Sequence, residues 1–534
     1  MQKFTMAVGD KVMYKTTIKT TYNELLSILF FILLFTAKGF GLYDGQRLFN
    51  LLIGMAAVLL AIKLLGEKYS LAEILICSVI GILMLYNYRL SYDKGLLLCM
   101  CMFLMVKNCR IERICKVGAC VWGITGIFNF WLSMRGIHEG RVVLHSKLGG
   151  EILRYSFGQP HPNILHLTYF IFCCLFLYSL KNNRDRLRYW NRILFVGNIL
   201  LFLYTISYTS VILGGILYLG IAYLDRYKEI NWMDWVAAYG TLVCTLICSI
   251  AIPILLDFRN DKFQLLNKIF HTRTQLLNRY FEAYSVTAFG QWILDYTRVS
   301  SQLDNSWATL YLGGGVILFT CVCVLYAWGL YYFLKQKQKM ELLIMVCLLL
   351  GGVTESFLFN TSLKNIGLLF LGTAVYEKTC RSEKNKIVLF PKLNRDLNKS
   401  LELKIPEWND GKLLTMRLAI TLGIIALPVA WLITNQIDMP QSYYVSSMDY
   451  AADGIIVTSE TVTDEIRKDT STKVYNYAGD GGTMWHVNSE RIRRIEYIRT
   501  LVGIVIGIYL AELAIAYIVL MLKEKRDKEC SKAI

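Results

Sequence analysis

Long apolar stretches alternate with short polar ones along most of the chain. A run of about 20 apolar residues is long enough to cross the hydrocarbon core of a bilayer as a helix. About fourteen stretches fit this description, although several are shorter. They predict an all-α, polytopic membrane protein with approximate spans at Leu25–Phe40, Arg47–Lys63, Leu71–Tyr86, Leu96–Val106, Val117–Met134, Ile164–Leu180, Ile193–Ile206, Ser210–Leu224, Trp235–Leu255, Trp307–Leu334, Leu342–Phe357, Ile366–Val375, Leu418–Ile433 and Leu501–Leu522.

The basic residues between these stretches predict the orientation of the chain. Lys and Arg are enriched in short cytoplasmic loops. With alternating spans, one set of basic loops falls on the same side as the N-terminus and contains Lys107, Arg110, Arg113, Lys116, Lys181, Arg184, Arg186, Arg188, Arg192, Lys335, Lys337, Lys339, Lys523, Lys525, Arg526 and Lys528. Both termini are therefore expected in the cytoplasm. The first span lacks a cleavable signal pattern and is expected to be retained.

The composition favours a membrane protein and argues against a nucleic-acid partner. The 534 residues are 55% hydrophobic and the mean hydropathy is +0.42, which excludes an ordinary soluble protein. The net charge of +17 comes mainly from membrane-flanking loops, so it indicates topology rather than nucleic-acid binding. All fifteen cysteines fall in predicted spans or on the cytoplasmic side, so no extracellular disulfide framework is expected.

The pattern divides the chain into three regions. Residues 1–376 form a membrane domain with about twelve spans, and residues 377–416 form a polar cytoplasmic linker. Residues 417–534 then form a two-span unit that carries a small extracytoplasmic segment at 435–499. That segment has few apolar residues, so its stability is expected to depend on the membrane or the main body.

The outer loop between Leu256 and Ser306 is unusually basic. Short basic loops are disfavoured outside, so a ligand explains these charges better than topology does. The planar guanidinium of Arg273 or Arg279 offers paired N–H donors that suit a phosphate or pyrophosphate. Alternatively, both contact only lipid phosphates, since residues 276–284 have apolar positions at helical spacing and can lie in the interface. The basic residues of this loop are Arg259, Lys262, Lys268, Arg273, Arg279 and Arg298.

Asp304 and Asn305 stand immediately before the span that begins near Trp307. A carboxylate beside apolar Trp307 and Leu310 is expected to have a raised pKa, which suits a general base. The alternative role is structural, because Asp, Asn and Ser are all good N-cap residues for the helix that follows. The sequence leaves both roles open.

A second group of polar candidates lies at the entrance of another span. Arg154 is a second phosphate-binding candidate, and His161 and Asn163 are hydrogen-bonding candidates in a turn rich in helix breakers. Glu355 lies near the outer end of its own span. Charges within membrane segments are costly and commonly functional, although pairing with a structural arginine explains Glu355 equally well.

Two familiar motifs are absent from the sequence. There is no Asp-x-Asp pair, so a carboxylate-bound divalent metal of the usual glycosyltransferase type is not supported. There is also no Gly-x-x-x-x-Gly-Lys-Ser/Thr phosphate loop, which argues against nucleotide hydrolysis. No metal or other cofactor is therefore expected.

The order of these features is similar to that of a known family. A span entrance is followed by a paired span with a Ser/Thr-rich junction, and a large outer loop then leads into a glycine-bearing span. This arrangement resembles the superfamily of O-antigen ligases and O-antigen polymerases. The resemblance covers roughly Arg154 to Phe357 and rests on Arg154…Gly158…Pro162-Asn163, Ser207-Tyr208-Thr209-Ser210, Arg279…Gly290 and Asp304-Asn305-Ser306…Leu312-Gly313-Gly314.

The resemblance implies an all-helical membrane glycosyltransferase of the bacterial cytoplasmic membrane. Such enzymes transfer a glycan from a polyprenyl diphosphate to an acceptor hydroxyl at the outer face without metal. By this similarity, Arg154 and Arg279 would contact the diphosphate. Asp304 falls where ligases have a functional histidine, which favours a polymerase. The junction at 207–210 lacks the arginine often found there, which leaves that contact to Arg273.

We therefore expect a polymerase of lipid-linked repeat units. Asp304, with His161, would deprotonate the acceptor hydroxyl, and the remaining candidates would bind substrate. A ligase would use nearly the same residues. A transporter or flippase of lipid-linked sugars is a third alternative, which predicts functional charges near mid-membrane. The expected partners are the polyprenyl-diphosphate-linked oligosaccharide, membrane lipids, and a flippase and chain-length regulator of the same pathway. The substrate-binding candidates are Arg154, Arg279, Arg273, Asn163, Asn305 and Glu355.

Overall fold

The chain is mostly helical in the computed structural model. Within the described residues, nine helices are long and apolar enough to cross a membrane, which supports the predicted all-α, multi-pass membrane fold. The chain divides into two compact units: a main unit of residues 21–141 and 155–399, and a second unit of residues 1–20, 142–154 and 400–534. The structure describes residues 15–135, 142–147, 150–255, 264, 273–295, 297–299, 302–379, 386–406, 416–437, 442–445, 457–458, 475–476, 483–486 and 490–533.

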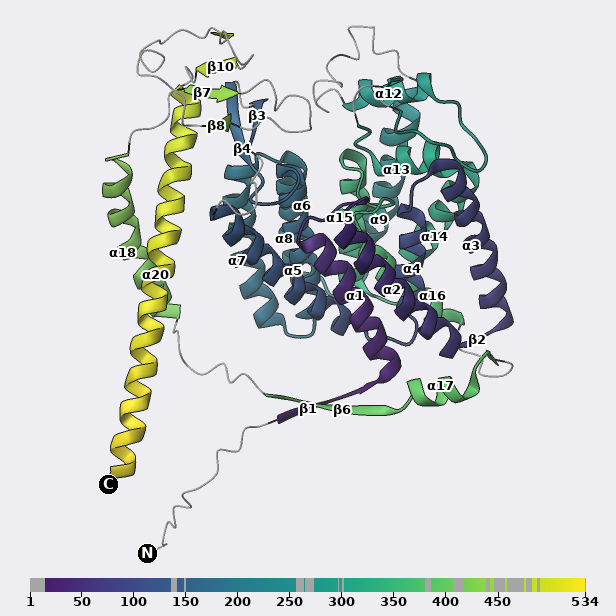
Figure 1. Ribbon diagram of the computed structural model, residues 1–534, viewed down its shortest axis with the longest axis horizontal. Coiled ribbons are helices and arrows are strands. Elements are labelled where there is room, and N and C mark those ends of the chain that lie inside the picture. The colour runs from purple at the N-terminus through teal and green to yellow at the C-terminus, as the bar shows by residue number, and fades with distance from the viewer. Residues whose placement is uncertain are drawn as a thin grey trace, which may run out of the picture. The chain divides into compact units, whose positions relative to one another are not determined.

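The main unit is a bundle of helices that run side by side (Figure 1). Two short strands, β2 (Lys68–Tyr69) and β5 (Ile387–Val388), pair at its edge. The described helices are α1 (Tyr22–Gly39), α2 (Arg47–Gly66), α3 (Leu71–Ser91), α4 (Gly95–Met105), α5 (Ile111–Met134), α6 (Pro162–Ser179), α7 (Arg184–Thr205), α8 (Tyr208–Arg226), α9 (Trp232–Leu246) with η1 (Ile247–Ala251) and α10 (Ile252–Leu255), α12 (Arg273–Ala283), α13 (Ser306–Thr309) with η2 (Leu310–Gly314) and α14 (Gly315–Lys335), α15 (Lys339–Thr354), α16 (Gly367–Thr379) and α17 (Pro391–Leu397).

The second unit contains two helices and several short strands. Its helices α18 (Met416–Thr434) and α20 (Glu490–Ala533) pack against each other. Four strands form a sheet in the order β8-β7-β10-β9, in which Met484 of β10 is paired with Tyr444 of β7. The strands of this unit are β1 (Lys15–Thr21), β3 (Val142–Lys147), β4 (Gly150–Tyr155), β6 (Ser400–Pro406), β7 (Ser442–Val445), β8 (Val457–Thr458), β9 (Tyr475–Asn476) and β10 (Thr483–His486).

Polar residues set where the apolar helices of the main unit begin. Ser70 and Glu73 form a capping box at the start of α3, and Asn231 and Asp234 form another at the start of α9. Such caps satisfy backbone N–H groups that have no partner within the helix. Each helix can therefore start where the polar loop ends: α3 begins at the predicted Leu71, and α9 begins at Trp232, ahead of the predicted Trp235.

Apolar side chains lie on both the inside and the outside of the bundle. Phe31 and Phe35 of α1 are fully buried, whereas Val58 of α2 and Ile82 of α3 are 60% and 65% exposed. In a water-soluble protein, such a large exposed apolar surface would favour association. In a bilayer it is the surface that contacts lipid, so the burial pattern agrees with the membrane assignment.

Helix α12 lies at one end of the main unit and α17 at the other, and we call these the α12 end and the α17 end (Figure 1). Successive helices run in alternating directions. The connecting segments at the α12 end therefore include residues 92–94, 155–161, 302–305 and 355–366. These segments carry most of the candidate site residues of the main unit.

The predicted spans all overlap helices, with shifts at their boundaries. Helix α15 ends at Thr354, before the predicted limit at Phe357, and α20 begins at Glu490, ahead of the predicted Leu501. Part of the predicted linker is folded, since α17 packs against α2. The division between the two units falls after Lys399, later than the change of composition near residue 376.

Helix α4 depends on a buried lysine at the α17 end. It has 11 residues and is therefore about 16 Å long, roughly half the thickness of a hydrocarbon core. Lys63, which is fully buried, donates hydrogen bonds to the carbonyl oxygens of Met105 (2.8 Å) and Lys107 (2.7 Å). The same ammonium group donates to Ser27 Oγ at 2.6 Å. Lys63 thus donates to carbonyl groups at and just after the end of α4, where the Met105 oxygen also accepts from Ser27 Oγ at 2.8 Å.

We predict that Lys63→Met destabilises the main unit by about 2–4 kcal/mol, because buried carbonyl groups lose a charged donor. Thermal unfolding of the detergent-purified protein measures this. Lys116→Met is the matched control, because Lys116 of α5 is exposed. Equal melting temperatures for the two variants would contradict the role given to Lys63.

Candidate functional site

The start of α6 brings one group of candidates to the α12 end. Phe157 and Gly158 both have positive φ (42° and 82°), so the chain turns sharply before the helix. Helix α6 then begins at Pro162, where a residue without an N–H group is well tolerated. His161 is the N-cap, and its Nδ1 accepts a hydrogen bond from the backbone N–H of Asn163 at 3.1 Å. The structure therefore gives His161 a defined capping role.

The start of α13 separates the two roles that the sequence left open for Asp304. The N-cap is Asn305, whose Oδ1 accepts from the backbone N–H of Ala308 at 2.8 Å. Asn305 is fully buried, and its Nδ2 also donates to Val353 O (2.7 Å) and to Ser249 Oγ (3.0 Å). Asp304 is therefore not needed as the cap.

Ser306 fixes the end of α15 against the start of α13. Its hydroxyl donates to the carbonyl oxygen of Glu355 at 2.6 Å and accepts from the backbone N–H groups of Phe357 (3.0 Å) and Leu358 (3.1 Å). These bonds hold the backbone at Glu355 in a set position relative to Asp304. Asp304 and Glu355, 51 positions apart in the sequence, consequently carry side chains toward the same arginine.

That arginine is Arg273, the first residue of α12. Its Nη2 lies 3.2 Å from Glu355 Oε1 and 3.8 Å from Asp304 Oδ2, and its Nη1 donates to the carbonyl oxygen of Thr354. Asn163 Nδ2 donates to the same Glu355 Oε1 at 3.2 Å. We call Asn163, Arg273, Asp304 and Glu355 the Arg273 cluster.

The electrostatics of the Arg273 cluster favour a carboxyl group that can change protonation near neutral pH. Burial and the negative charge of Glu355 raise the pKa of Asp304 to about 6, and Arg273 opposes this rise. The Asp304 side chain is still 42% exposed, so a substrate can reach it. A carboxylate of this basicity is suited to accept a proton from a hydroxyl group in a reaction.

Lys364 is a charged neighbour that sequence reasoning missed. It lies between α15 and α16, is only 3% exposed, and donates to the carbonyl oxygen of Ile164 at 3.4 Å. Burial and the nearby charge of Lys38 lower its pKa to about 7, and Glu355 acts in the opposite direction. The signal was available, because the predicted topology places this lysine in an outer connection, where basic residues are disfavoured.

The other two predicted arginines differ from Arg273 in their setting. Arg279, farther along α12, is exposed. Arg154 lies in β4, is only 2% exposed and belongs to the second unit. Arg273 lies within ion-pair distance of both Asp304 and Glu355. The alternative that Arg273 only contacts lipid phosphates does not fit its position between two carboxylates.

Two π-helical segments adjoin the cluster. The first, η1, supplies Ser249, which accepts the hydrogen bond from Asn305. The second, η2, follows α13 directly. Short π-helical segments inside α-helices occur frequently at functional sites. Among the residues that the structure describes, no three His, Cys, Asp or Glu side chains are grouped so that they could hold a metal ion.

We predict that Glu355→Gln lowers the pKa of Asp304 from about 6 by roughly one unit, because a neighbouring negative charge is removed. Arg273→Gln should raise it, because an attractive positive charge is lost. The pH dependence of carbodiimide coupling at Asp304, read by mass spectrometry, measures both shifts, since the protonated carboxyl group reacts. A coupling midpoint that neither substitution moves would refute this electrostatic description.

Searches of protein-family models, curated protein sequences and solved structures found no match to this chain.

Proposed function

We propose that the protein is a membrane glycosyltransferase that polymerises lipid-linked oligosaccharide repeat units of a surface polysaccharide. The observation that carries the proposal is the placement of Arg273 within reach of two carboxylates, 3.2 Å from Glu355 and 3.8 Å from Asp304, at one end of a membrane bundle. Such a cluster contains a base for a hydroxyl group and a cation for a phosphate. Both are needed to transfer a glycan from a polyprenyl diphosphate.

The reaction follows from these two groups. Asp304 takes the proton of the acceptor hydroxyl, whose oxygen then forms a bond to the anomeric carbon of the donor glycan. The bond between that carbon and the diphosphate oxygen breaks, and the diphosphate leaves with the electron pair. Arg273, with Lys364 close by, stabilises the negative charge that develops on the leaving group. Arg279, exposed on the same helix, is a further candidate for contact with the lipid diphosphate.

The orientation is part of the proposal. The basic loops predict cytoplasmic termini, which makes the α12 end of the main unit the outer face of the bacterial cytoplasmic membrane. Repeat units carried by a polyprenyl lipid would be joined at that face. The Arg273 cluster lies among the connecting segments at the end of the bundle rather than in mid-membrane, which supports an enzyme over a transporter.

A ligase that transfers finished glycan to another acceptor is the alternative function. It would use the same base and the same cation. Asp304 stands where the resembled ligases have a histidine, and this substitution favours the polymerase. The two functions differ in their products, which separates them experimentally.

We predict that Arg273→Gln and Asp304→Asn cause cells to accumulate single repeat units on the lipid carrier, with polymer reduced about 100-fold or more. Gel analysis of the lipid-linked glycan measures the chain lengths. Arg298→Gln is the matched control, because the Arg298 side chain is 58% exposed, forms an ion pair with nearby Asp295 and lies over the Tyr284 ring. It should leave the ladder unchanged.

Arg279→Ala tests direct contact with the lipid diphosphate, and we expect shorter and less abundant polymer. Long polymer that remains on the lipid carrier in the Arg273→Gln and Asp304→Asn cells would indicate the ligase. Unchanged ladders in both variants, with normal amounts of folded protein, would rule out the proposed chemistry and favour transport.

A further inference from the structure

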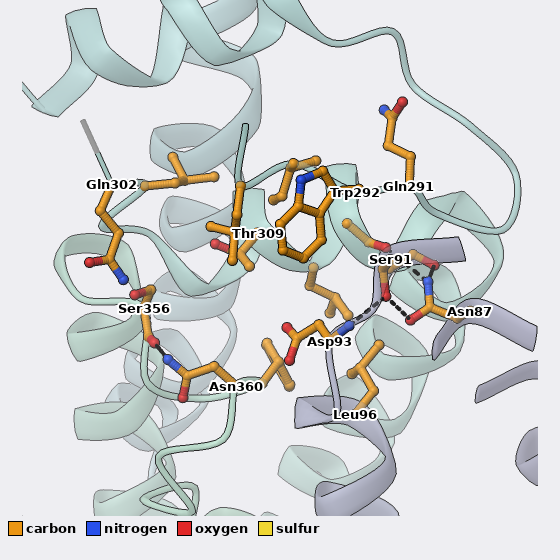
Figure 2. A pocket seen from close by; sticks show the side chains of 17 residues that line it. Asn87, Ser91, Asp93, Leu96, Gln291, Trp292, Gln302, Thr309, Ser356 and Asn360 are labelled. Atoms are coloured by element: carbon orange, nitrogen blue, oxygen red, sulfur yellow. Dashed lines mark hydrogen bonds between the residues drawn. The ribbon is translucent and has the colours of Figure 1, made fainter. Parts of the chain in front are cut away.

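A cavity lies beside the Arg273 cluster at the α12 end of the main unit. Three parts of the chain line it: the turn between α3 and α4, residues 291–294 together with 302–314, and residues 356–360 (Figure 2). Its volume is about 680 Å³ including the open mouth. Because this figure counts the solvent at the mouth, it describes an open recess whose wall can contact a single sugar ring rather than an enclosed cavity.

The wall that holds Trp292 is fixed by a buried asparagine. Asn87 Nδ2 donates to the carbonyl oxygens of Phe289 and Gly313, both at 2.8 Å. Gly290 adopts φ of +88°, and a Cβ atom there would lie 2.0 Å from Gly313 O. The close approach of these two segments therefore requires glycine at position 290. The result is a loop that holds its aromatic side chain in one place.

The cavity combines an aromatic face with open hydrogen-bonding groups. Trp292 is 44% exposed, and the ring of Tyr92 packs edge-on against it with centroids 6.1 Å apart. Asp93, Trp292 and Gln302 all line the cavity, and in Figure 2 Gln302 lies across from Asp93 and Trp292. Asp93 Oδ1 accepts from the backbone N–H of Gly95 at 2.8 Å, and no described residue binds its other oxygen.

These groups suit a carbohydrate better than an apolar ligand or an anion. The face of an indole ring carries negative charge density, which attracts the C–H groups of a sugar ring. A carboxylate accepts hydrogen bonds from hydroxyl groups and repels phosphate, and the Gln302 amide can both donate and accept. Among the residues that the structure describes, the lining contains no lysine or arginine.

The cavity shares its backbone with the Arg273 cluster. Leu303, which lines the cavity, precedes Asp304, and Ser356, which also lines it, follows Glu355. Thr309, another lining residue, donates through Oγ1 to Asn305 O at 2.7 Å. A sugar in the cavity would therefore lie close to the carboxylate that the proposed function uses as the base.

We propose that this cavity binds the terminal sugar of the acceptor glycan. Trp292 stacks on the sugar ring, the Asp93 carboxylate accepts hydrogen bonds from its hydroxyl groups, and the Gln302 amide donates hydrogen bonds to them or accepts from them. This inference rests on the proposed function and adds the acceptor site to it. Asp93 and Trp292 are substrate-binding residues in this account, and they leave the proton transfer and the leaving group to the Arg273 cluster.

The test measures binding of a soluble oligosaccharide to the full-length protein in lipid nanodiscs. The probe is the repeat-unit oligosaccharide released by mild acid from the lipid-linked pool of the producing cells. Saturation-transfer NMR gives its affinity for each variant. We expect Trp292→Ala and Asp93→Asn each to weaken binding about tenfold. Trp292→Phe, which keeps an aromatic face, should lose less affinity for the oligosaccharide than Trp292→Ala.

Two controls make the outcome specific. Phe289→Ala removes a neighbouring ring that is 39% exposed and is not part of the cavity lining, so it should bind like the unaltered protein. Arg273→Gln should bind the oligosaccharide normally while it forms no polymer. This variant separates a failure of the acceptor site from a failure of the proposed function.

Each possible result either supports the acceptor site or overturns it. A tenfold loss of affinity for the oligosaccharide that is confined to Trp292→Ala and Asp93→Asn would establish the acceptor site. Equal binding by those variants and the unaltered protein would overturn it, and so would an absence of detectable binding. In either of these cases, a loss of polymer in Arg273→Gln cells would still support the proposed chemistry.

Discussion

The contact of Arg273 with Glu355 and Asp304 joins parts of the chain that are distant in sequence. A guanidinium group near two carboxylates is stable in a membrane protein only where the charges compensate one another. Here Arg273 Nη2 lies 3.2 Å from one carboxylate and 3.8 Å from the other. Asn163 brings the start of α6 to the same Glu355 oxygen. The arrangement at the α12 end depends on this charge compensation.

The charges also explain why the cluster is suited to chemistry as well as to structure. Burial and the negative charge of Glu355 raise the pKa of Asp304 to about 6, against the opposing charge of Arg273. A diphosphate that bound Arg273 would compete with the carboxylates for the same N–H groups. Binding of the donor would then release Asp304 from its ion pair at the moment when a base is needed. The resting contacts and the proposed reaction thus use the same groups.

Much of the membrane architecture was predictable, because the position and length of each apolar run indicate where a helix can cross the bilayer. Each predicted span overlaps a helix, since the bilayer requires a continuous apolar segment with its backbone hydrogen bonds satisfied internally. The observed helices differ from the predicted spans at their ends. Helix α15, for example, ends at Thr354 rather than at the predicted Phe357. The end of a helix depends on individual hydrogen bonds, such as those made by the Ser306 hydroxyl. The spacing of apolar residues along the sequence does not encode these bonds.

The candidate site was predictable in its members more than in its contacts. Asp304, Glu355 and Asn163 were identified as polar groups near span ends, and Arg273 was identified as a basic residue in an outer loop, where basic residues are disfavoured. The choice of Arg273 over Arg279 as their partner depends on how a long loop folds back, and no local pattern specifies that. The raised pKa of Asp304 was expected from its apolar neighbours, but the contribution of Glu355 required the tertiary structure.

Reconstitution of the purified protein in vesicles with its lipid-linked repeat unit as the sole substrate tests the central claim most directly. The account predicts one molecule of polyprenyl diphosphate released for every new glycosidic bond, with no reaction by the Arg273→Gln protein. Movement of the lipid-linked glycan across the vesicle membrane, without bond formation or diphosphate release, would contradict it.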